Sequence, residues 1–431
     1  MYISQCVIAK NEEDNIGYCL SHLKSVVDEQ IVVDTGSTDK TVEIAKGLGA
    51  KVFHFEWIND FSAARNFALD KAKGDWIIFL DCDEYFSEES VPLIQETIIK
   101  HGENRNIEGL TCELINIDAS NNKIFATSKN ISPRIFKRKR YLRYRKRVHE
   151  ILQNVKNNPV NPVITDVSDQ LVVFHTGYSE EAKKEKNKDE RNLNLLNKEI
   201  EENPYDSKWN LYYAKQLNSA GRHQESLEYA YKAHEFMDAD IVYDYYYSIY
   251  SLIMFNMVSL NKPYIEVKNV FDEAVSKYPH FPDYYMSMAT VALKDKKIDE
   301  AIDLFEKCIY YCENYTDYVE SLAFGNIVGI YTNLLNAYVI NNNKQKIVKT
   351  SIALLNTNKF DIKTLSILIK TFLAQEKEED IINFLRKLYD YNNGKDKMYL
   401  LKASELVENS ILIDYYKKLL SEEEFEVLKK L

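Results

Sequence analysis

The chain has 431 residues, of which 45% are apolar and 28% are charged, and its formal net charge is −11 at pH 7. These values are typical of a globular protein with about two or three domains, and the negative charge argues against a general nucleic-acid-binding protein. No apolar run is long enough to span a membrane, and the first residues lack the basic and apolar regions of a signal peptide. The six scattered cysteines indicate neither a disulfide framework nor a zinc site, which favours a reducing cytoplasm.

The beginning of the chain, up to Leu80, alternates between short apolar strands and amphipathic helices. We expect strands at residues 2–9, 30–33, 51–53 and 76–80. Helices are expected between them, the first ending at Val27, the second near Leu48 and the third spanning residues 60–72. This alternation predicts a parallel sheet with right-handed crossovers. Residues 76–80 are all apolar, so this strand is predicted to lie centrally with both faces covered.

Polar side chains follow three of these strands. Asn11 follows the first strand, Asp34 ends the second, and Asp81 and Asp83 follow the fourth. The carboxyl ends of parallel strands meet at one edge of a sheet, where α/β proteins bind their ligands. Two carboxylates one residue apart are also compatible with solvated turn residues. In this position, however, they suit Mg²⁺ or Mn²⁺, with a phosphorylated substrate completing the coordination.

Four groups of residues occur in an order that resembles a known family. They are Asn11-Glu12-Glu13, residues 32–41, the group Trp57, Asp60-Phe61-Ser62 and Arg65-Asn66, and Asp81-Cys82-Asp83. Together they resemble a family 2 glycosyltransferase with the GT-A nucleotide-sugar fold. The expected fold class is therefore an α/β GT-A domain followed by an all-α, tetratricopeptide-like helical-repeat domain. Thr35 departs from the pattern, because many relatives carry a second acidic residue there.

The resemblance assigns roles to individual residues. It implies that Asp34 and Arg65 contact the nucleotide base, that Asp81 reaches the ribose or a metal, and that Asp83 ligates the metal bridging the diphosphate. The other expected contacts to the nucleotide sugar are Ala9, Asn11, Glu12, Thr35 and Cys82. A departing nucleoside diphosphate needs a cation to stabilise its charge. We therefore expect a UDP-sugar donor and dependence on Mg²⁺ or Mn²⁺.

Residues 105–178 have a β-rich pattern. A hairpin is expected from strands at 110–117 and 124–127 around a turn at 119–123, followed by a strand at 133–137. Residues 137–147 then hold eight Lys or Arg with Tyr141 and Tyr144 among them. Such a stretch can bind nucleic acid, phosphates or an anionic surface. We interpret it as the solvated basic face of a hairpin.

Glu150 and His175 complete the predicted site. In the GT-A superfamily, an acidic residue at the start of a helix after the metal strand commonly acts as the base, and a later histidine commonly completes the metal site. Glu150 and His175 match these positions by their order. The resemblance thus makes Glu150 and Asp83 catalytic, and Asp81, Asp83 and His175 metal ligands. A histidine at the end of an apolar strand is often only structural, but its place after the Asp-x-Asp group favours a site.

From residue 179 onward the sequence predicts helices. A charged helix is expected at 180–202, and one or two of its first basic residues are expected to reach the diphosphate: Lys183, Lys184, Lys186, Lys188 and Arg191. Phe271 and Ala274 recur as Phe305 and Cys308, a spacing that matches the tetratricopeptide period of about 34 residues. We therefore expect helical repeats that fade after residue 320. The predicted domains are 1–185 and 186–431. Tyrosines at 243–250 are interpreted as helix-packing residues.

This order of domains resembles the sublancin-type peptide S-glycosyltransferases of glycosylated bacteriocins. The resemblance implies inverting transfer of a hexose from UDP-glucose or UDP-N-acetylglucosamine to Cys or Ser of a small peptide, with the helical domain used for peptide capture and for a homodimer. Two alternatives stay open: a glucosyltransferase of lipopolysaccharide or cell-wall glycan assembly, and a non-catalytic scaffold with a vestigial sugar-nucleotide domain. The intact Asp81, Asp83, Glu150 and His175 argue against the scaffold.

Overall fold

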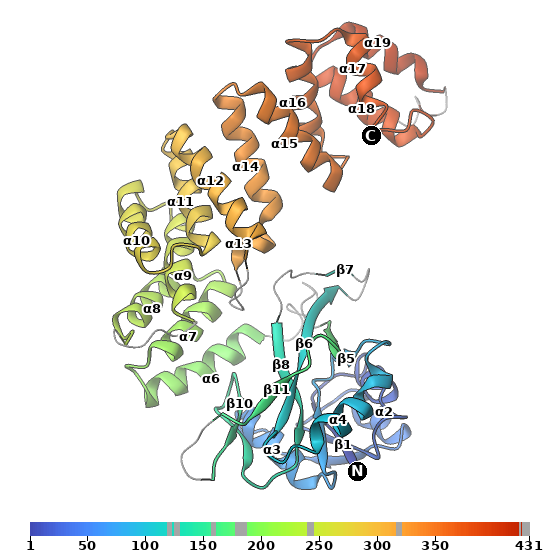
Figure 1. Ribbon diagram of the computed structural model, residues 1–431, viewed down its shortest axis with the longest axis vertical. Coiled ribbons are helices and arrows are strands. Elements are labelled where there is room, and N and C mark those ends of the chain that lie inside the picture. Colours follow the sequence, from blue (N-terminus) through green and yellow to red (C-terminus); the bar gives the residue numbers. More distant parts are fainter. Residues whose placement is uncertain are drawn as a thin grey trace. The chain divides into compact units, whose positions relative to one another are not determined.

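The computed structural model describes residues 1–118, 123–124, 130–156, 161–176, 188–238, 245–315, 321–421 and 424. The chain divides into two compact units (Figure 1). Unit 1 comprises Met1–Leu260 with Thr316–Gly325, and unit 2 comprises Asn261–Tyr315 with Asn326–Leu431. The domain boundary expected at residue 185 lies outside the described residues, and the unit that holds the sheet continues to Leu260.

The described strands of unit 1 form one mixed sheet and a separate two-stranded hairpin. The sheet has the order β3-β2-β1-β4-β8-β6-β12-β5, with β7 and β11 paired to β6, and the hairpin is β9-β10. The strands are β1 (Ile3–Ala9), β2 (Glu29–Asp34), β3 (Lys51–His54), β4 (Trp76–Phe79), β5 (Glu84–Phe86), β6 (Gly109–Asp118), β7 (Lys123–Ile124), β8 (Asn130–Lys137), β9 (Leu142–Arg145), β10 (Ile151–Asn154), β11 (Ile164–Asp166) and β12 (Val172–His175).

The first half of the sheet is parallel, as expected from the sequence. Strand β1 pairs with β2 and β4, and β2 pairs with β3, all in parallel. Ala9 lies opposite Asp34, so the carboxyl ends of β1 and β2 meet at one edge. All four residues of β4 are buried, which confirms its central position. The helix expected to reach Val27 is shorter, however, and ends at Ser21.

Side chains from the sheet explain the early end of this helix. The Gln5 side-chain amide donates to the Cys19 carbonyl at 2.8 Å, and that of Gln30 donates to the Leu20 carbonyl at 2.6 Å. A helix normally satisfies these carbonyls with N–H groups four residues further along the chain. Here buried glutamines on β1 and β2 take that role. The helix can therefore end at Ser21 without leaving these carbonyls unpaired, and the chain turns toward β2.

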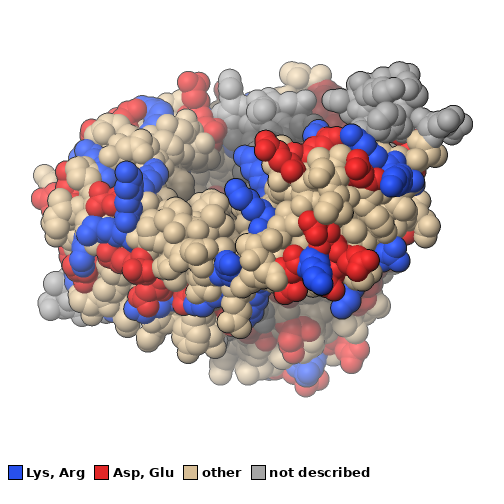
Figure 2. Space-filling model, turned by 90° about the horizontal axis from the view of Figure 1, so that it is seen from above, with Lys and Arg blue, Asp and Glu red and all other residues tan. Residues whose placement is uncertain are grey.

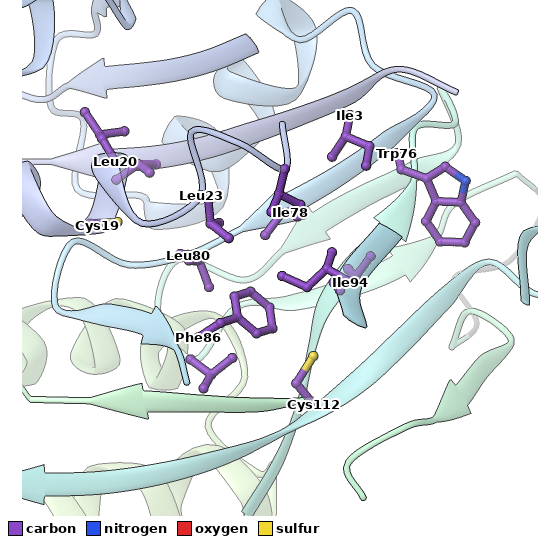
Figure 3. Packing of buried hydrophobic residues seen from close by; sticks show 14 of the residues in the cluster. Ile3, Cys19, Leu20, Leu23, Trp76, Ile78, Leu80, Phe86, Ile94 and Cys112 are labelled. Carbon is purple, nitrogen blue, oxygen red and sulfur yellow. The ribbon is translucent and has the colours of Figure 1, made fainter. Parts of the chain in front are cut away.

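An apolar cluster fixes the loop that carries the Asp-x-Asp group. Leu80 precedes this loop and Phe86 lies shortly after it, and both are buried in the same cluster. Figure 3 shows them with neighbours from β1, β4 and the flanking helices, including Ile3, Leu20, Ile78 and Ile94. Burying a side chain of this size contributes about 1.5–3 kcal/mol. Both ends of the 81–83 loop are thus anchored in the core.

The second half of the sheet contains the antiparallel pairs. Strand β8 runs antiparallel to β4 and β6, and β5 runs antiparallel to β12. Although β5 closely follows β4 in the chain, it lies at the far end of the sheet order. The strand expected at 110–117 is confirmed as β6, and the one at 133–137 is the end of the longer β8. Of the hairpin predicted after β6, residues 119–122 and 125–129 lie outside the described residues.

The basic stretch forms part of the β9-β10 hairpin and its flanks. Arg143 pairs with Asp70 at 2.9 Å, Arg147 pairs with Glu202 at 2.7 Å, and Arg138 donates to the Gly74 carbonyl at 2.7 Å. The hairpin is confirmed, but these three arginines bind groups of the protein, so the stretch is not simply a solvated face. Figure 2 shows Lys and Arg side chains interspersed with Asp and Glu over the visible face.

Helices cover the sheet of unit 1 and continue the chain beyond it. Successive helices α6 to α9 pack one on the next. The described helices of this unit are α1 (Ile16–Ser21), α2 (Thr41–Gly47), α3 (Phe61–Lys71), the 3₁₀ turn η1 (Val91–Leu93), α4 (Ile94–Gly102), α6 (Lys188–Glu202), α7 (Ser207–Ser219), α8 (His223–Glu235), α9 (Tyr246–Ser259) and α13 (Leu322–Gly325). Tyr246 and Tyr250 are buried, as expected of helix-packing residues, whereas Tyr243 lies outside the described residues.

Unit 2 is helical throughout its described residues. Its helices are α10 (Tyr264–Lys277), α11 (Pro282–Lys294), α12 (Ile298–Glu313), α14 (Ile327–Ile340), α15 (Lys344–Thr357), α16 (Ile362–Leu373), α17 (Glu378–Leu385), α18 (Gly394–Leu406) and α19 (Ser410–Leu419). The starts of α10 and α12 are separated by one tetratricopeptide period, and so are the starts of α15 and α17. This period therefore persists past residue 320, where we expected it to fade. Among the described residues, none of the helices has both the length and the apolar character needed to cross a bilayer.

Candidate active site

A cleft of about 970 Å³ opens at the carboxyl edge of the parallel strands. Its walls come from the ends of β1, β2, β4 and β12, from α3, from the segment between β9 and β10, and from the first turn of α6. The predicted site residues that line it are Ala9, Asn11, Glu12, Thr35, Arg65, Asp81, Cys82, Asp83, Glu150 and His175. Asp34 is described by the structure but is not among the residues lining the cleft. The fold thus brings together side chains from the first strand of the sheet to the last.

Asp34 organises the loop that follows β2. Its carboxylate accepts hydrogen bonds from the backbone N–H groups of Ser37 at 3.0 Å and Gly36 at 3.3 Å. Burial opposes ionisation, but hydrogen bonds from the Ser37 hydroxyl and N–H, from His54 and from the Gly36 N–H lower the pKa of Asp34. The next residue, Thr35, donates its hydroxyl to the Ala9 carbonyl at 3.1 Å and so joins the ends of β1 and β2.

Asn11 connects the end of β1 to the same loop. It has a left-handed backbone with φ of 54°, a conformation that asparagine tolerates better than most residues. Its side-chain oxygen accepts from the Thr38 N–H at 2.8 Å, and its own N–H donates to the Ser37 hydroxyl at 3.0 Å. The Glu12 N–H donates to the Thr41 hydroxyl at 2.7 Å. Hydrogen bonds between backbone N–H groups and side-chain oxygens therefore hold the wall of the cleft at this edge.

Arg65 is the cation at the centre of the site. Its Nε donates to Glu150 Oε1 at 2.6 Å and its Nη2 donates to Asp81 Oδ1 at 2.8 Å. The guanidinium also lies 4.8 Å from the centre of the Phe79 ring. Burial disfavours the charged form, but Asp81 and Glu150 raise the pKa of Arg65 further above its ordinary value. Arg65 therefore binds two carboxylates within the protein and orients both of them.

Arg134 is a site residue that the sequence analysis did not identify. It lies on β8, pairs with the buried Glu84, and has its Nη2 3.9 Å from Asp81 Oδ2. Burial opposes the ionisation of Asp81, yet Arg65 and then Arg134 lower its pKa. The signal in the sequence was a single arginine inside a strand of the sheet core. Asp81 is thus compensated by two guanidinium groups, which makes it a weaker candidate for a metal ligand than Asp83.

Asp83 and His175 form a separate pair. Asp83 Oδ2 lies 3.4 Å from His175 Nε2, and the Asp83 carbonyl accepts from the Thr176 N–H at 3.0 Å. The other imidazole nitrogen, Nδ1, lies 2.9 Å from the Asn116 side-chain oxygen and donates to it. Burial disfavours the imidazolium, but Asp83 raises the pKa of His175. With Nδ1 as the donor, Nε2 faces the carboxylate, and either a proton or a metal cation between them satisfies both groups.

The donor set fits a divalent metal held partly by its substrate. Carboxylate and imidazole both ligate Mn²⁺, and carboxylate suits Mg²⁺. Within the described ranges, no group of three or more His, Cys, Asp and Glu side chains is arranged to hold a metal. Asp83 and His175 would therefore supply two ligands, and diphosphate oxygens and water would supply the remainder. Cys82 is buried, and burial raises the pKa of its thiol, so it contributes packing and no thiolate.

Glu150 lies just before β10, in the connection from β9, whereas the superfamily position that it matches by order lies at the start of a helix. The two strands form a hairpin because Leu142, Tyr144 and Leu152 bury their side chains in a common cluster. The Glu150 carboxylate is largely buried, with 13% of the side chain exposed, and Oε1 is held by Arg65. The described residues place no hydrogen-bond donor on Oε2.

The first turn of α6 adds Arg191 and Asn192 to the cleft. The Arg191 guanidinium lies 5.2 Å from the centre of the Phe61 ring, and burial lowers the pKa of Arg191 although Glu12 opposes this. Among the described residues, no carboxylate forms an ion pair with Arg191. The other basic residues predicted near the diphosphate lie outside the described residues, wholly or in their side chains: Lys183, Lys184, Lys186 and Lys188.

Comparisons with known proteins agree with this architecture. The model of Glycosyl transferase family 2 matches residues 4–154. The SPbeta prophage-derived glycosyltransferase SunS of Bacillus subtilis is 28% identical over 233 residues, which cover 53% of this chain and 52% of SunS. A TPR repeat-containing protein of Synechococcus elongatus is 51% identical over 82 residues, covering 19% of this chain and 20% of that protein. The chain therefore spans about half the length of SunS and a fifth of the cyanobacterial protein.

A solved structure is also similar over part of its length. Glucosyl-3-phosphoglycerate synthase from Mycobacterium tuberculosis, in complex with Mn²⁺, UDP and glucosyl-3-phosphoglycerate, is 25% identical, with a TM-score of 0.23 over 27% of this chain and 44% of that one. The family match covers the first strands of the sheet, most of the cleft and the β9-β10 hairpin. Residues 4–154 of this chain thus form a glycosyltransferase domain of family 2, and tetratricopeptide-like helices follow it.

Proposed function

We propose that the chain transfers a hexose from a UDP-sugar, with inversion, to the thiol or hydroxyl of a Cys or Ser in a small peptide, assisted by Mg²⁺ or Mn²⁺. One observation carries the proposal. A single cleft holds the Asp83–His175 pair, suited to a metal-bound diphosphate, together with Glu150, a carboxylate suited to accept a proton. Its volume of about 970 Å³ lies in the range of pockets that bind whole cofactors and substrates.

The charges of the cleft explain how it would accept an anionic donor. Its lining includes Glu12, Asp81, Asp83 and Glu150, which would repel a diphosphate if they were uncompensated. Arg65 and Arg134 offset part of this charge, because the two guanidinium groups are shared among Asp81, Glu150 and Glu84. Asp83 and His175 would hold a divalent metal, which would supply positive charge to the departing diphosphate. Arg191 would add a second positive charge from another element, α6.

Glu150 is positioned to act as the general base. Arg65 donates to Oε1 and fixes the plane of the carboxylate, which leaves Oε2 as the oxygen that takes the proton. The acceptor loses this proton as its sulfur or oxygen attacks the anomeric carbon from the face opposite the diphosphate. The attack therefore inverts the configuration at that carbon. Partial burial of the carboxylate keeps water from competing for the same position.

A peptide is the proposed acceptor because of the helices. Stacked helical repeats form extended surfaces that bind segments of other chains. SunS, which is similar over about half of this chain, is by name a glycosyltransferase. We also propose, as a separate point, that the helical repeats form a homodimer, which light scattering of the purified protein would test.

The function is tested with purified protein, a panel of UDP-sugars, and peptides that differ only in carrying Cys, Ser or Ala. We expect UDP release from UDP-glucose or UDP-N-acetylglucosamine, and a hexose adduct by mass spectrometry on the Cys or Ser peptide but not on the Ala peptide. The same assay includes oligosaccharide acceptors. Transfer to these alone would replace the peptide assignment with a glycan one, and no UDP release from any donor would refute the glycosyltransferase proposal.

A further inference from the structure

We propose that Arg147 is a positioning residue, through which helix α6 sets the orientation of Glu150. The inference rests on the proposed role of Glu150 as the base. Arg147 lies in the 146–149 bend, which directly precedes Glu150. Arg147 itself does not line the cleft. Its influence on the chemistry would therefore be exerted through the backbone of this bend.

Arg147 is held by two carboxylates of α6. Its Nη2 donates to Glu202 Oε1 at 2.7 Å and its Nη1 to Glu202 Oε2 at 2.9 Å, so the pair is bidentate. Its Nη1 and its backbone N–H also donate to the buried Glu199 Oε1, at 3.3 Å and 3.2 Å. A bidentate guanidinium–carboxylate pair fixes orientation as well as distance. Helix α6 thus defines both the side chain and the backbone of Arg147.

The bend has a backbone conformation that needs such support. Lys146 has φ of 78° and His149 has φ of 51°, and this left-handed region is uncommon for residues other than Gly, Asn, Asp and His, so Lys146 is the more unusual of the two. Residues of this kind persist where their surroundings determine the backbone, and they are concentrated at functional sites. The two of them flank Arg147 within the bend. Glu150 follows the second one immediately.

Contacts from three helices hold the bend in place. From α3, the Phe61 N–H donates to the Arg147 carbonyl at 2.9 Å, and the Ser62 hydroxyl donates to the Lys146 carbonyl. From α7, Tyr212 stacks on the His149 ring at 4.3 Å between centroids, and Trp209 lies under the Lys146 ammonium at 4.5 Å. Arg147 provides the link to α6.

Glu150 is therefore oriented from two directions. Arg65 holds the end of its side chain, and the 146–149 bend holds its backbone. Without Arg147 the bend can relax toward ordinary backbone angles, which moves the Glu150 carboxylate but removes no group from the cleft. The apolar contacts of Val148 with Leu195, Leu196 and Trp209 remain, so the fold is retained.

The test uses the full chain and steady-state kinetics with a saturating acceptor. We expect Arg147→Met to lower kcat by about 10- to 100-fold, the effect of a misplaced catalytic group, with KM for the UDP-sugar and Kd for UDP unchanged. Arg147→Lys, which keeps the charge but loses the bidentate geometry, should give an intermediate kcat. The matched control is Arg143→Met, which breaks the Arg143–Asp70 pair on the same hairpin and should leave kcat unchanged.

A double variant separates positioning from other roles. Substitutions that act through the same group have non-additive effects on kcat. Adding Arg147→Met to Glu150→Gln should therefore lower kcat little more than Glu150→Gln alone. An equal loss in both backgrounds, or a rise in KM at constant kcat, would overturn the inference. If Arg147→Met does not fold, Glu202→Gln replaces it and is judged by the same two criteria. Wild-type activity of Glu150→Gln would overturn the base assignment together with this inference, whereas an inactive Glu150→Gln beside a normal Arg147→Met would overturn this inference alone.

Discussion

The carboxylate of Asp83 and the imidazole of His175 face each other across two strands, with Oδ2 3.4 Å from Nε2. Asp83 immediately precedes β5 and His175 ends β12, and these strands pair antiparallel with His175 opposite Glu84. Strand pairing, together with the Thr176 N–H on the Asp83 carbonyl, sets the separation of the two side chains. Asp83 itself lies in the 81–83 loop, and the pairing of β5 with β12 directly after it holds its carboxylate beside His175.

The metal prediction concerns this pair. We expect Asp83→Asn to reduce transfer to background, because the variant loses a ligand of the metal. We expect EDTA to do the same to the wild-type protein, because it removes the metal whose positive charge the departing diphosphate requires. Added Mn²⁺ or Mg²⁺ should restore the wild-type protein but not the variant. Circular dichroism checks that the variant is folded. Full transfer in EDTA would show that the reaction needs no divalent metal.

The base prediction compares two acceptors. Cysteine has a reference pKa of about 8.5 and is partly thiolate at neutral pH, whereas a serine hydroxyl is not ionised. We therefore expect Glu150→Gln to cost a factor on the order of 10²–10⁴ with a Ser peptide and much less with a Cys peptide. The loss with Cys should shrink further as the pH rises toward about 9. Equal, pH-independent losses on matched peptides would assign Glu150 a structural role instead.

The diphosphate prediction concerns Arg191. Because no described carboxylate pairs with it, its charge is available to an anionic ligand in the cleft. We expect Arg191→Met to weaken UDP binding by about 10-fold, equivalent to about 1.4 kcal/mol, measured by calorimetry. Arg222→Met, next to α8, removes an exposed pair with Glu225 and is the matched control. Unchanged UDP affinity in Arg191→Met would place the diphosphate away from α6.

The pH prediction concerns stability. Although His149 is exposed at the surface, the packing of its ring on Tyr212 desolvates the imidazole and lowers its pKa, with Glu150 opposing this and Lys215, Lys146 and Lys208 adding to it. The folded protein then binds fewer protons than the unfolded chain. The stability that neutral His149 contributes is therefore complete above the unfolded pKa of about 6.5 and is lost as the pH falls from there toward the lower pKa of the folded state. We expect Tm to fall between about pH 7.5 and 5.5, and to fall less in His149→Phe, which preserves the stack on Tyr212. An equal fall of Tm in His149→Phe would contradict this assignment.

The sequence predicted those features that depend on local pattern. The apolar run at 76–80 identified the central strand, and carboxylates directly after apolar runs located the cleft. These inferences succeeded because strand burial and the geometry of a parallel sheet follow from short stretches of chain. The recurrence of Phe271 and Ala274 likewise identified the repeats, since each repeat is a local unit.

Long-range pairing explains what the sequence did not predict. Arg65 binds a carboxylate 85 residues away and Arg134 one 50 residues away, and no local pattern specifies such partners. The position of β5 at the far end of the sheet, away from β4, which it follows in the chain, is equally non-local. Glu150 was matched to a superfamily position by its order in the chain alone, and the pairing of Arg145 with Ile151 places it in a hairpin connection.

The extension of unit 1 beyond its sheet has a consequence for recombination between related enzymes. Helix α6 contributes Arg191 to the cleft and Glu199 and Glu202 to the bend before Glu150, although it follows the last strand of the sheet. A chimera joined directly after β12 would pair this catalytic domain with a foreign α6 and lose those groups. A crossover beyond α9 would exchange repeats and leave the cleft intact. Under the proposal that the repeats bind the acceptor, exchange of repeats downstream of Leu260 is expected to change the acceptor range.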